Sequence, residues 1–196
     1  MNESVRLLLA LLLAVLIGSC GPIEAGEPPL KGATIGGPFT LTDHNGRTVS
    51  DAQFAGRYRL VYFGYSYCPD ICPVDLQLIG QGLRQFERTD KARAARVQPI
   101  FITTDPERDT PAVLKQYVAA FHPRLIGLTG TPEQIDAVKK SFGVYSEKQQ
   151  QAGASGYLVN HSRVAMLFGP KGEPIAIVPH DQDAEAVAAE LERWVE

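Results

Sequence analysis

The order of hydrophobic and polar positions predicts a chain that alternates between strands and helices. Two apolar runs, residues 59–65 and 97–103, are rich in β-branched, aromatic and aliphatic side chains and predict buried strands. Between them, residues 74–86 carry apolar side chains at helical spacing without a proline, which indicates a helix. This order predicts a βαβ unit with a right-handed crossover.

The flanking segments continue the alternation. Residues 39–42 and 47–49 surround Asn45-Gly46, a dipeptide typical of tight hairpin turns, so a small antiparallel β element is expected before the main fold. Further helices are expected over 111–121, 132–142 and 183–195, and further strands over 125–128, 157–168 and 175–178. Together these elements predict an α/β chain with a thioredoxin-like fold, an N-terminal β-hairpin addition and an inserted helix.

Some segments are expected at the surface. Residues 146–156, which read SEKQQQAGASG, are polar and low in complexity and predict a mobile surface loop. His122 and His180 lie at predicted helix or strand ends, where ordinary surface positions are expected.

The beginning of the chain predicts an export signal over residues 1–19. Arg6 precedes the apolar run LLLALLLAVLIG, which is shorter than the ~20 residues that cross a bilayer. The segment Ile17–Cys20 resembles a bacterial lipobox, in which the cysteine is lipidated and becomes the first mature residue. An ordinary cleaved signal and a short uncleaved anchor are the alternatives. Each of the three places the domain outside the cytoplasm, on the periplasmic or extracytoplasmic face of a membrane.

The residues after the signal predict a connection to one folded domain. Residues 20–37 contain glycine, proline and glutamate with little periodicity, which predicts a flexible tether. The domain is then expected over residues 38–196, because 196 residues with 44% hydrophobic content can bury one core. The net charge of −3 and the lack of a Lys/Arg-rich run give a nucleic-acid or anionic-membrane surface no electrostatic support.

Candidate chemistry centres on residues 62–76, which read YFGYSYCPDICPVDL. Cys68 and Cys72 lie at the predicted strand-to-helix turn, where backbone N–H groups and the helix dipole favour negative charge, so both thiols are expected to have lowered pKa values. The four-residue spacing is expected to bring the sulfurs to one face, where they can close a redox-active disulfide or hold one metal ion. A stabilising disulfide is the alternative, although so short a loop removes little unfolded-state entropy.

Three motifs resemble those of the Sco/SenC family. CPDICP follows an aromatic strand, DPERDTP occupies residues 105–111, and VNHS occupies residues 159–162, in the order that the family has them. The resemblance covers the chain from about Gly36 to the C-terminus. It implies a copper-binding protein that helps to assemble the copper centre of cytochrome c oxidase.

The resemblance also implies His161, in VNHS, as a third metal ligand beside Cys68 and Cys72. Two thiolates select soft ions such as Cu(I), and an imidazole completes a three-coordinate site that stays open to a receiving protein. Cu(I) is the expected ion, with Cu(II) as a further candidate. Structural zinc requires four closed ligands, and the sequence has no second cysteine cluster to supply them.

The DPERDTP motif adds three candidate residues near the site. Asp105, Arg108 and Asp109 follow a predicted strand, at the same sheet edge as the cysteines if the two strands are parallel. Asp109 or Thr110 is expected to cap the next helix. Capping leaves Asp105 and Arg108 unexplained, and the resemblance implies a supporting or partner-docking role for the motif. A salt-bridged loop is the alternative.

The sequence thus predicts a membrane-anchored, extracytoplasmic copper chaperone that metallates the dinuclear copper centre of cytochrome c oxidase. Its expected partners are the copper-bearing oxidase subunit and an upstream copper donor or thiol reductase, and catalytic turnover is not required. The alternative is a membrane-tethered thiol-disulfide oxidoreductase in which Cys68 attacks and Cys72 resolves. One reduced pair can perform both tasks. A redox sensor that signals through oxidation of the pair is a third interpretation.

Overall fold

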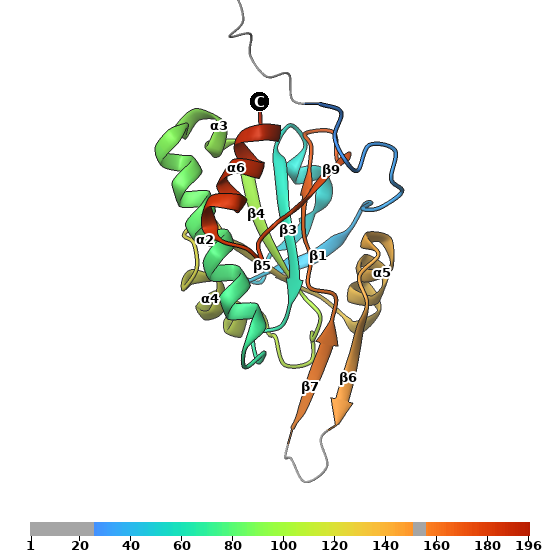
Figure 1. Cartoon of the computed structure of the whole chain (residues 1–196). Coiled ribbons are helices and arrows are strands. Elements are labelled where there is room, and N and C mark those ends of the chain that lie inside the picture. Colours follow the sequence, from blue (N-terminus) through green and yellow to red (C-terminus); the bar gives the residue numbers. More distant parts are fainter. Residues whose placement is uncertain (1–25, 151–155) are drawn as a thin grey trace, which may run out of the picture.

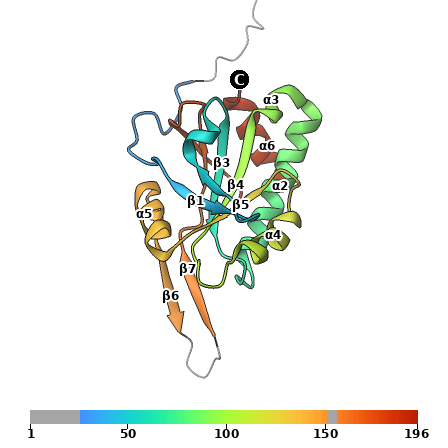
Figure 2. The same cartoon turned by 180° about the vertical axis from the view of Figure 1, so that it is seen from behind.

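The computed structural model describes residues 26–150 and 156–196. The predicted signal, Cys20 and the first residues of the predicted tether lie outside the described residues. Figures 1 and 2 show a central sheet with helices on both faces and a hairpin that projects from one end. Within the described ranges, none of the helices combines the length and the apolar content needed to cross a membrane.

Seven strands form the central sheet in the order β2-β1-β5-β4-β3-β8-β9. Strands β3, β4 and β5 are parallel, while β8 and β9 extend the sheet antiparallel from β3. The predicted N-terminal hairpin joins the other edge, because β1 pairs antiparallel with β5. The strands of this sheet are β1 (Thr40–Asp43), β2 (Thr48–Ser50), β3 (Tyr58–Gly64), β4 (Val97–Thr103), β5 (Ile126–Thr129), β8 (Ala165–Phe168) and β9 (Pro174–Val178).

Helices cover both faces of the sheet (Figures 1 and 2). Helices α2, α4 and α6 bury side chains in one core cluster, and α5 and η1 bury theirs in the other. Their bounds are η1 (Asp51–Phe54), α2 (Ile71–Thr89), α3 (Lys91–Ala95), α4 (Pro111–Ala119), α5 (Pro132–Phe142) and α6 (Ala184–Trp194).

Strand β3 supplies side chains to both core clusters. Leu60 and Tyr62 belong to the cluster under α2, α4 and α6, whereas Val61 and Phe63 belong to the cluster under α5. Successive side chains of a strand point to opposite faces, so an apolar run is what a strand with both faces covered requires. The predicted buried strand is confirmed, and its parallel pairing with β4 confirms the βαβ unit.

Local signals placed the starts of α4, α5 and α6 to within one residue, whereas α3 was not predicted and α2 extends three residues beyond the predicted helix at each end. The side chains of Thr110, Thr131 and Asp183 accept hydrogen bonds from backbone N–H groups in the first turns of α4, α5 and α6. The cap of α4 is therefore Thr110 and not Asp109. Helix α2 begins at Ile71, three residues before the predicted start. Pro73 is tolerated in its first turn, because the N–H that proline lacks has no helical partner there.

The predicted loop over residues 146–156 is partly wrong. Strand β6 (Ser146–Gln150) pairs antiparallel with β7 (Tyr157–His161) in a separate two-stranded sheet, and residues 151–155 lie outside the described residues. The side chains of β6 are mostly exposed, so no apolar alternation marks the strand. The expected single strand over 157–168 is likewise divided, since β7 and β8 belong to different sheets.

The described part of the predicted tether lies on the domain. Leu30 N donates to Ile175 O at 3.0 Å, and Gly36 N donates to Ser141 O at 2.9 Å. Figure 1 shows the chain entering the domain at the end that holds the C-terminus, whereas the β6–β7 hairpin projects from the opposite end. The strands β3 and β4 finish at the hairpin end, and the candidate site lies there.

Candidate metal centre

The two cysteines lie on consecutive structural segments at the end of β3. Cys68 belongs to the loop before α2, and its N–H donates to Tyr65 O at 3.2 Å. Cys72 is the second residue of α2 and is fully buried. Cys72 N donates to Cys68 Sγ at 3.5 Å, so the first sulfur accepts from the free N-terminal end of the helix. The sulfurs are adjacent as predicted, although only Cys72 is helical.

His161 reaches the thiols from the end of β7. Its Nδ1 lies 3.0 Å from Ser162 O, and because a carbonyl oxygen only accepts, Nδ1 carries the proton. The lone pair of Nε2 then faces Cys72 Sγ at 3.1 Å. The ring of Tyr65 packs edge-on against the imidazole, with centroids 5.9 Å apart. The side chain is thereby oriented with its ligating nitrogen toward both sulfurs.

The residues fit a soft metal ion. The ligand atoms of Cys68, Cys72 and His161 all lie within 4.8 Å of one another. Both cysteines are free thiols in the structure, and Cys68 is partly exposed. Two sulfurs and one imidazole nitrogen form the kind of donor set that suits Cu(I). The structure therefore brings together the three residues that the sequence singled out, and the disulfide between the two cysteines stays a prediction.

The two thiols differ in acidity, which corrects the expectation of two lowered pKa values. A hydrogen bond from the Cys72 thiol is the main cause that lowers the pKa of Cys68 to about 3, against the opposing effect of burial, and the Cys72 and Asp70 backbone N–H groups add to it. The pKa of Cys72 is raised, because its thiol donates to Cys68 and is buried. The site thus contains one thiolate beside one protonated thiol.

A buried polar network beneath Cys72 was missed by the sequence analysis. Asp75 Oδ2 accepts from Tyr62 OH at 2.8 Å and from Arg163 Nε at 2.7 Å, and His180 Nε2 lies 3.4 Å away. Burial opposes the charge on Asp75, but the His180, Arg163 and Tyr62 side chains lower its pKa to about 2. The available signal was a carboxylate on the apolar side of a helix, three residues after Cys72.

The expected surface positions of two histidines are wrong. His180 and His122 are each only 3% exposed. His180 belongs to the network beneath Cys72, and His122 lies 3.5 Å from Glu87, away from the thiols. Both histidines lie at the ends of segments, and other elements of the fold bury them. The local sequence does not reveal this burial.

Gly64 provides the space for the buried sulfur. A Cβ atom at this position would lie 2.9 Å from Cys72 Sγ. The glycine ends β3, and its carbonyl accepts from Thr104 N at 2.7 Å. No larger side chain fits between the strand and the Cys72 thiol without moving one of them.

The three candidate residues of the DPERDTP motif lie beside the site, as predicted for parallel strands. Asp109 accepts from Ser66 N at 3.0 Å, in the loop that carries Cys68. Arg108 pairs with the buried Asp105 at 2.5 Å and donates to Tyr157 O, in the strand that carries His161.

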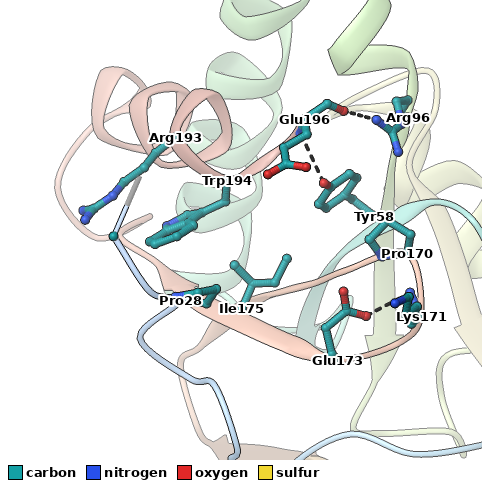
Figure 3. A pocket seen from close by; sticks show the side chains of 11 residues that line it. Pro28, Tyr58, Arg96, Pro170, Lys171, Glu173, Ile175, Arg193, Trp194 and Glu196 are labelled. Carbon is teal, nitrogen blue, oxygen red and sulfur yellow. Dashed lines mark hydrogen bonds between the residues drawn. The ribbon is translucent and has the colours of Figure 1, made fainter. Parts of the chain in front are cut away.

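A separate cavity lies at the opposite end of the domain. Its volume is about 370 Å³, and Figure 3 shows Trp194, Ile175 and Pro28 lining it together with Tyr58, the first residue of β3. The length of the seven-residue strand separates it from the thiols by roughly 20 Å. The candidate metal centre is therefore a partly exposed cluster and not part of this cavity.

The chain is similar in sequence to proteins of one known family. A family profile described as SCO1/SenC matches residues 27–196. The mitochondrial Protein SCO2 homolog of Bos taurus is 46% identical over 144 residues, which cover 73% of this chain and 53% of the relative. Protein SenC of Rhodobacter capsulatus is 42% identical over 158 residues, which cover 80% of this chain and 68% of the relative. The chain spans between about half and two thirds of the length of the mitochondrial relatives that it matches.

Solved structures agree with the sequence comparison. The structure of Bradyrhizobium japonicum ScoI with copper bound is 39% identical and has a TM-score of 0.73. The match covers 82% of this chain and 99% of the ScoI chain. The thioredoxin domain of a thiol-disulfide oxidoreductase from Bacteroides vulgatus has a TM-score of 0.57. That domain is 16% identical, over 83% of this chain and 96% of its own, so it shows the fold alone.

The structural matches show that the chain has a thioredoxin-like fold, with the cysteine pair at the end of the first strand of its βαβ unit, which confirms the predicted fold. The chain belongs to the SCO1/SenC family, which confirms the resemblance of its three motifs.

The thiol asymmetry predicts an unusual pH dependence of alkylation. Because the pKa of Cys68 is about 3, the rate at which iodoacetamide alkylates Cys68 in the reduced protein should stay nearly constant from about pH 5 to pH 8. In Cys72→Ala the hydrogen bond from the second thiol is lost, so the pKa of Cys68 rises and the rate should increase with pH. Mass spectrometry of the alkylated peptide measures both profiles. A wild-type rate that rises about tenfold per pH unit would identify Cys68 as an ordinary thiol.

Proposed function

We propose that this chain is a copper-binding assembly factor that holds Cu(I) through Cys68, Cys72 and His161. Its proposed task is to deliver the ion to the dinuclear copper centre of cytochrome c oxidase. The observation that carries the proposal is the convergence of two sulfurs and one imidazole nitrogen within 4.8 Å. Membership of the SCO1/SenC family, whose Bradyrhizobium japonicum member was solved with copper bound, supports the choice of ion.

The acid–base state of the site favours loading by Cu(I). Cys68 already offers a thiolate at neutral pH, and His161 directs an unprotonated nitrogen to the same point. Binding then releases the proton of Cys72, because a metal ion binds the thiolate and not the thiol. The partial exposure of Cys68 leaves one side of the ion open to a receiving protein. Binding of Cu(II) remains a further prediction.

A second candidate function is reduction of a disulfide in the oxidase subunit or another protein. It is favoured by the partly exposed Cys68 thiolate beside a buried thiol. Cys68 attacks one sulfur of the target disulfide and expels the other as a thiolate. Cys72 loses its proton and attacks Cys68 Sγ, which expels the second target thiolate. The target gains two electrons, the chain is left with a Cys68–Cys72 disulfide, and an upstream thiol reductase must restore it.

One substitution separates the two functions, because the copper site needs His161 and thiol exchange does not. His161→Ala should weaken Cu(I) binding to the reduced protein by about tenfold or more, measured by competition with a Cu(I) chelator. The rate at which the mutant reduces a small disulfide should stay within a few-fold of wild type.

His44→Ala is the matched control. His44 lies in the turn between β1 and β2, where its Nδ1 accepts from Gly127 N of β5, and it is not grouped with the two thiols. It should leave both measurements unchanged. If His161→Ala binds Cu(I) as tightly as wild type, the imidazole is not a ligand. Disulfide reduction would then be the better supported function.

The surface around Cys68 supports docking of a protein partner, which we propose is the copper-bearing oxidase subunit. Three large apolar side chains near the cysteines are unusually exposed: Tyr67 at 52%, Ile71 at 37% and Val74 at 48%. All three belong to the loop and first turn that carry the thiols. Apolar side chains that rim a metal-transfer site allow a partner to cover the ion and exclude water.

A charge on this rim should impair transfer without affecting the metal site. Val74→Glu is expected to slow copper transfer to the soluble domain of the oxidase subunit by roughly tenfold, which corresponds to about 1.4 kcal/mol of docking free energy. Its Cu(I) affinity should equal that of wild type. The control is Ile177→Glu, on the opposite face of the sheet from the α2 cluster and similarly exposed, at 56%. If both variants slow copper transfer equally, the exposed apolar residues near the cysteines are not part of the docking surface.

We further propose that a lipid on Cys20 anchors the protein at the extracytoplasmic face of a membrane. The lipobox-like segment that ends at Cys20 supports this, as does the arrangement in Figure 1, where the chain enters the domain at the end away from the thiols. An anchor at that end would leave the proposed metal site on the side of the domain away from the membrane, where a partner can reach it.

Cys20→Ser should therefore block lipidation, and the protein should leave the membrane fraction. Fractionation and N-terminal mass spectrometry of the mature protein measure both effects. A mature, membrane-bound wild-type protein that retains Met1 would favour an uncleaved anchor over a lipid.

A further inference from the structure

The loop of residues 105–109, which we call the DPERD loop, contacts both segments that carry the proposed copper ligands. It follows β4, whereas the cysteines follow β3 and His161 ends β7. Of its side chains, Asp105 and Asp109 are completely buried and Arg108 is 24% exposed. Buried carboxylates cannot meet a docking partner, so the motif requires an explanation inside the molecule.

On the thiol side, the contact is made by Asp109. Its carboxylate accepts from Ser66 N at 3.0 Å and also from the Ser66 hydroxyl. Thr103 Oγ1 donates to the same carboxylate at 2.5 Å and holds it against the end of β4. Ser66 lies two residues before Cys68, so this contact fixes the path of the loop that presents the first thiol.

On the hairpin side, the contacts of the loop converge on Tyr157, at the start of β7, whose hydroxyl also lies 3.5 Å from Glu107 Oε2. The Tyr157 hydroxyl donates to Asp105 Oδ1 at 2.8 Å, and Arg108 Nη1 donates to Tyr157 O at 3.0 Å. The Arg108 guanidinium also stacks on the Tyr157 ring, 3.8 Å from its centroid. The Asp105–Arg108 ion pair orients both groups from within the loop.

The hairpin is held on the domain by side chains, including Val159, which packs against Tyr65 and Cys72. Strands β6 and β7 form their own two-stranded sheet, and β7 shares no ladder with the seven strands of the main sheet. A two-stranded hairpin is marginally stable alone, so its placement depends on side-chain contacts. One such contact is the hydrogen bond from Val159 N to Tyr65 OH, at 3.2 Å. A second is the hydrogen bond from Lys139 Nζ of α5 to Ser146 Oγ of β6, at 2.7 Å. The contacts at Tyr157 add hydrogen bonds to the buried Asp105 and from Arg108.

We propose that the DPERD loop is a clasp that sets the distance between His161 and the two thiols. Asp105 and Arg108 are positioning residues that act on His161 through Tyr157, and Asp109 holds the opposite side through Ser66. The inference rests on the proposed copper site and assigns a mechanical role to the motif, where the sequence left a supporting and a partner-docking role open.

The clasp predicts a local effect in the metal-free, reduced protein. Arg108→Gln should speed hydrogen exchange of the amides of residues 157–161, while the amides of β3 and β4 exchange as in wild type. Tyr157→Phe removes only the hydroxyl contact and should give a smaller change in the same direction. The control is Arg47→Gln, the same change in the Asp43–Arg47 ion pair of the N-terminal hairpin, which belongs neither to the DPERD loop nor to β7.

The effect on copper should pass entirely through His161. Arg108→Gln should weaken Cu(I) binding by about tenfold, the lower end for residues that orient a ligand. In a His161→Ala background the same substitution should cause no further loss of Cu(I) affinity. The Cys68–Cys72 reduction potential of Arg108→Gln should stay at its wild-type value. If Arg108→Gln prevents folding, Tyr157→Phe replaces it in the cycle.

The clasp would be overturned if the losses of Cu(I) affinity from Arg108→Gln and His161→Ala add in the double variant. It would also be overturned if Arg108→Gln leaves hydrogen exchange in β7 unchanged. The exchange measurement needs no metal. A wild-type protein that fails to bind Cu(I) would therefore refute the proposed function, while the local opening of β7 would still decide whether the loop holds the hairpin.

Discussion

The parallel pairing of β3 with β4 is the interaction on which the site depends. Its register runs from Tyr58 opposite Val97 to Gly64 opposite Thr103, so both strands finish at the same edge. The loop that carries the cysteines and the DPERD loop therefore leave the sheet side by side, although nearly forty residues separate them in the sequence. Displacement of this register would move Ser66 away from Asp109 and the thiols away from the hairpin.

The surroundings at this edge of the sheet give Cys68 and Cys72 different exposure and different acidity. Cys68 stands in a loop before the free N–H groups of α2, while Cys72 is enclosed by the helix, by Gly64 and by the polar network around Asp75. One sulfur is consequently a partly exposed thiolate and the other a buried thiol. This inequality suits both proposed activities, since a thiolate initiates metal capture as well as disulfide exchange, and the buried partner completes either step.

The proposed third ligand, His161, has no backbone ladder to the main sheet. His161 belongs to a small sheet of its own, so its distance from the sulfurs is decided by side chains and not by a backbone ladder. The stacked Arg108 and the buried Asp105 provide those contacts at Tyr157. A side chain held in this way can move without disturbing the core, which suits the proposed transfer of an ion to a partner.

The sequence alone determined the features that depend on neighbouring residues. Apolar periodicity marked the strands and helices of the core, side-chain acceptors such as Thr131 marked helix starts, and short motifs identified Cys68, Cys72 and His161. Tertiary structure decided the features that depend on which surfaces meet. Strand β6 was missed because its polar side chains carry no periodicity, and its identity comes from backbone pairing with β7.

Acidity and burial around the thiols were likewise settled only by the fold. The raised pKa of Cys72 follows from its contact with Cys68 and from enclosure, neither of which a four-residue spacing reveals. His180 reaches Asp75 across more than a hundred residues of sequence, and Tyr157 reaches Asp105 across about fifty. Burial and hydrogen bonding over such separations depend on the complete packing of the chain, so local patterns in the sequence do not specify them.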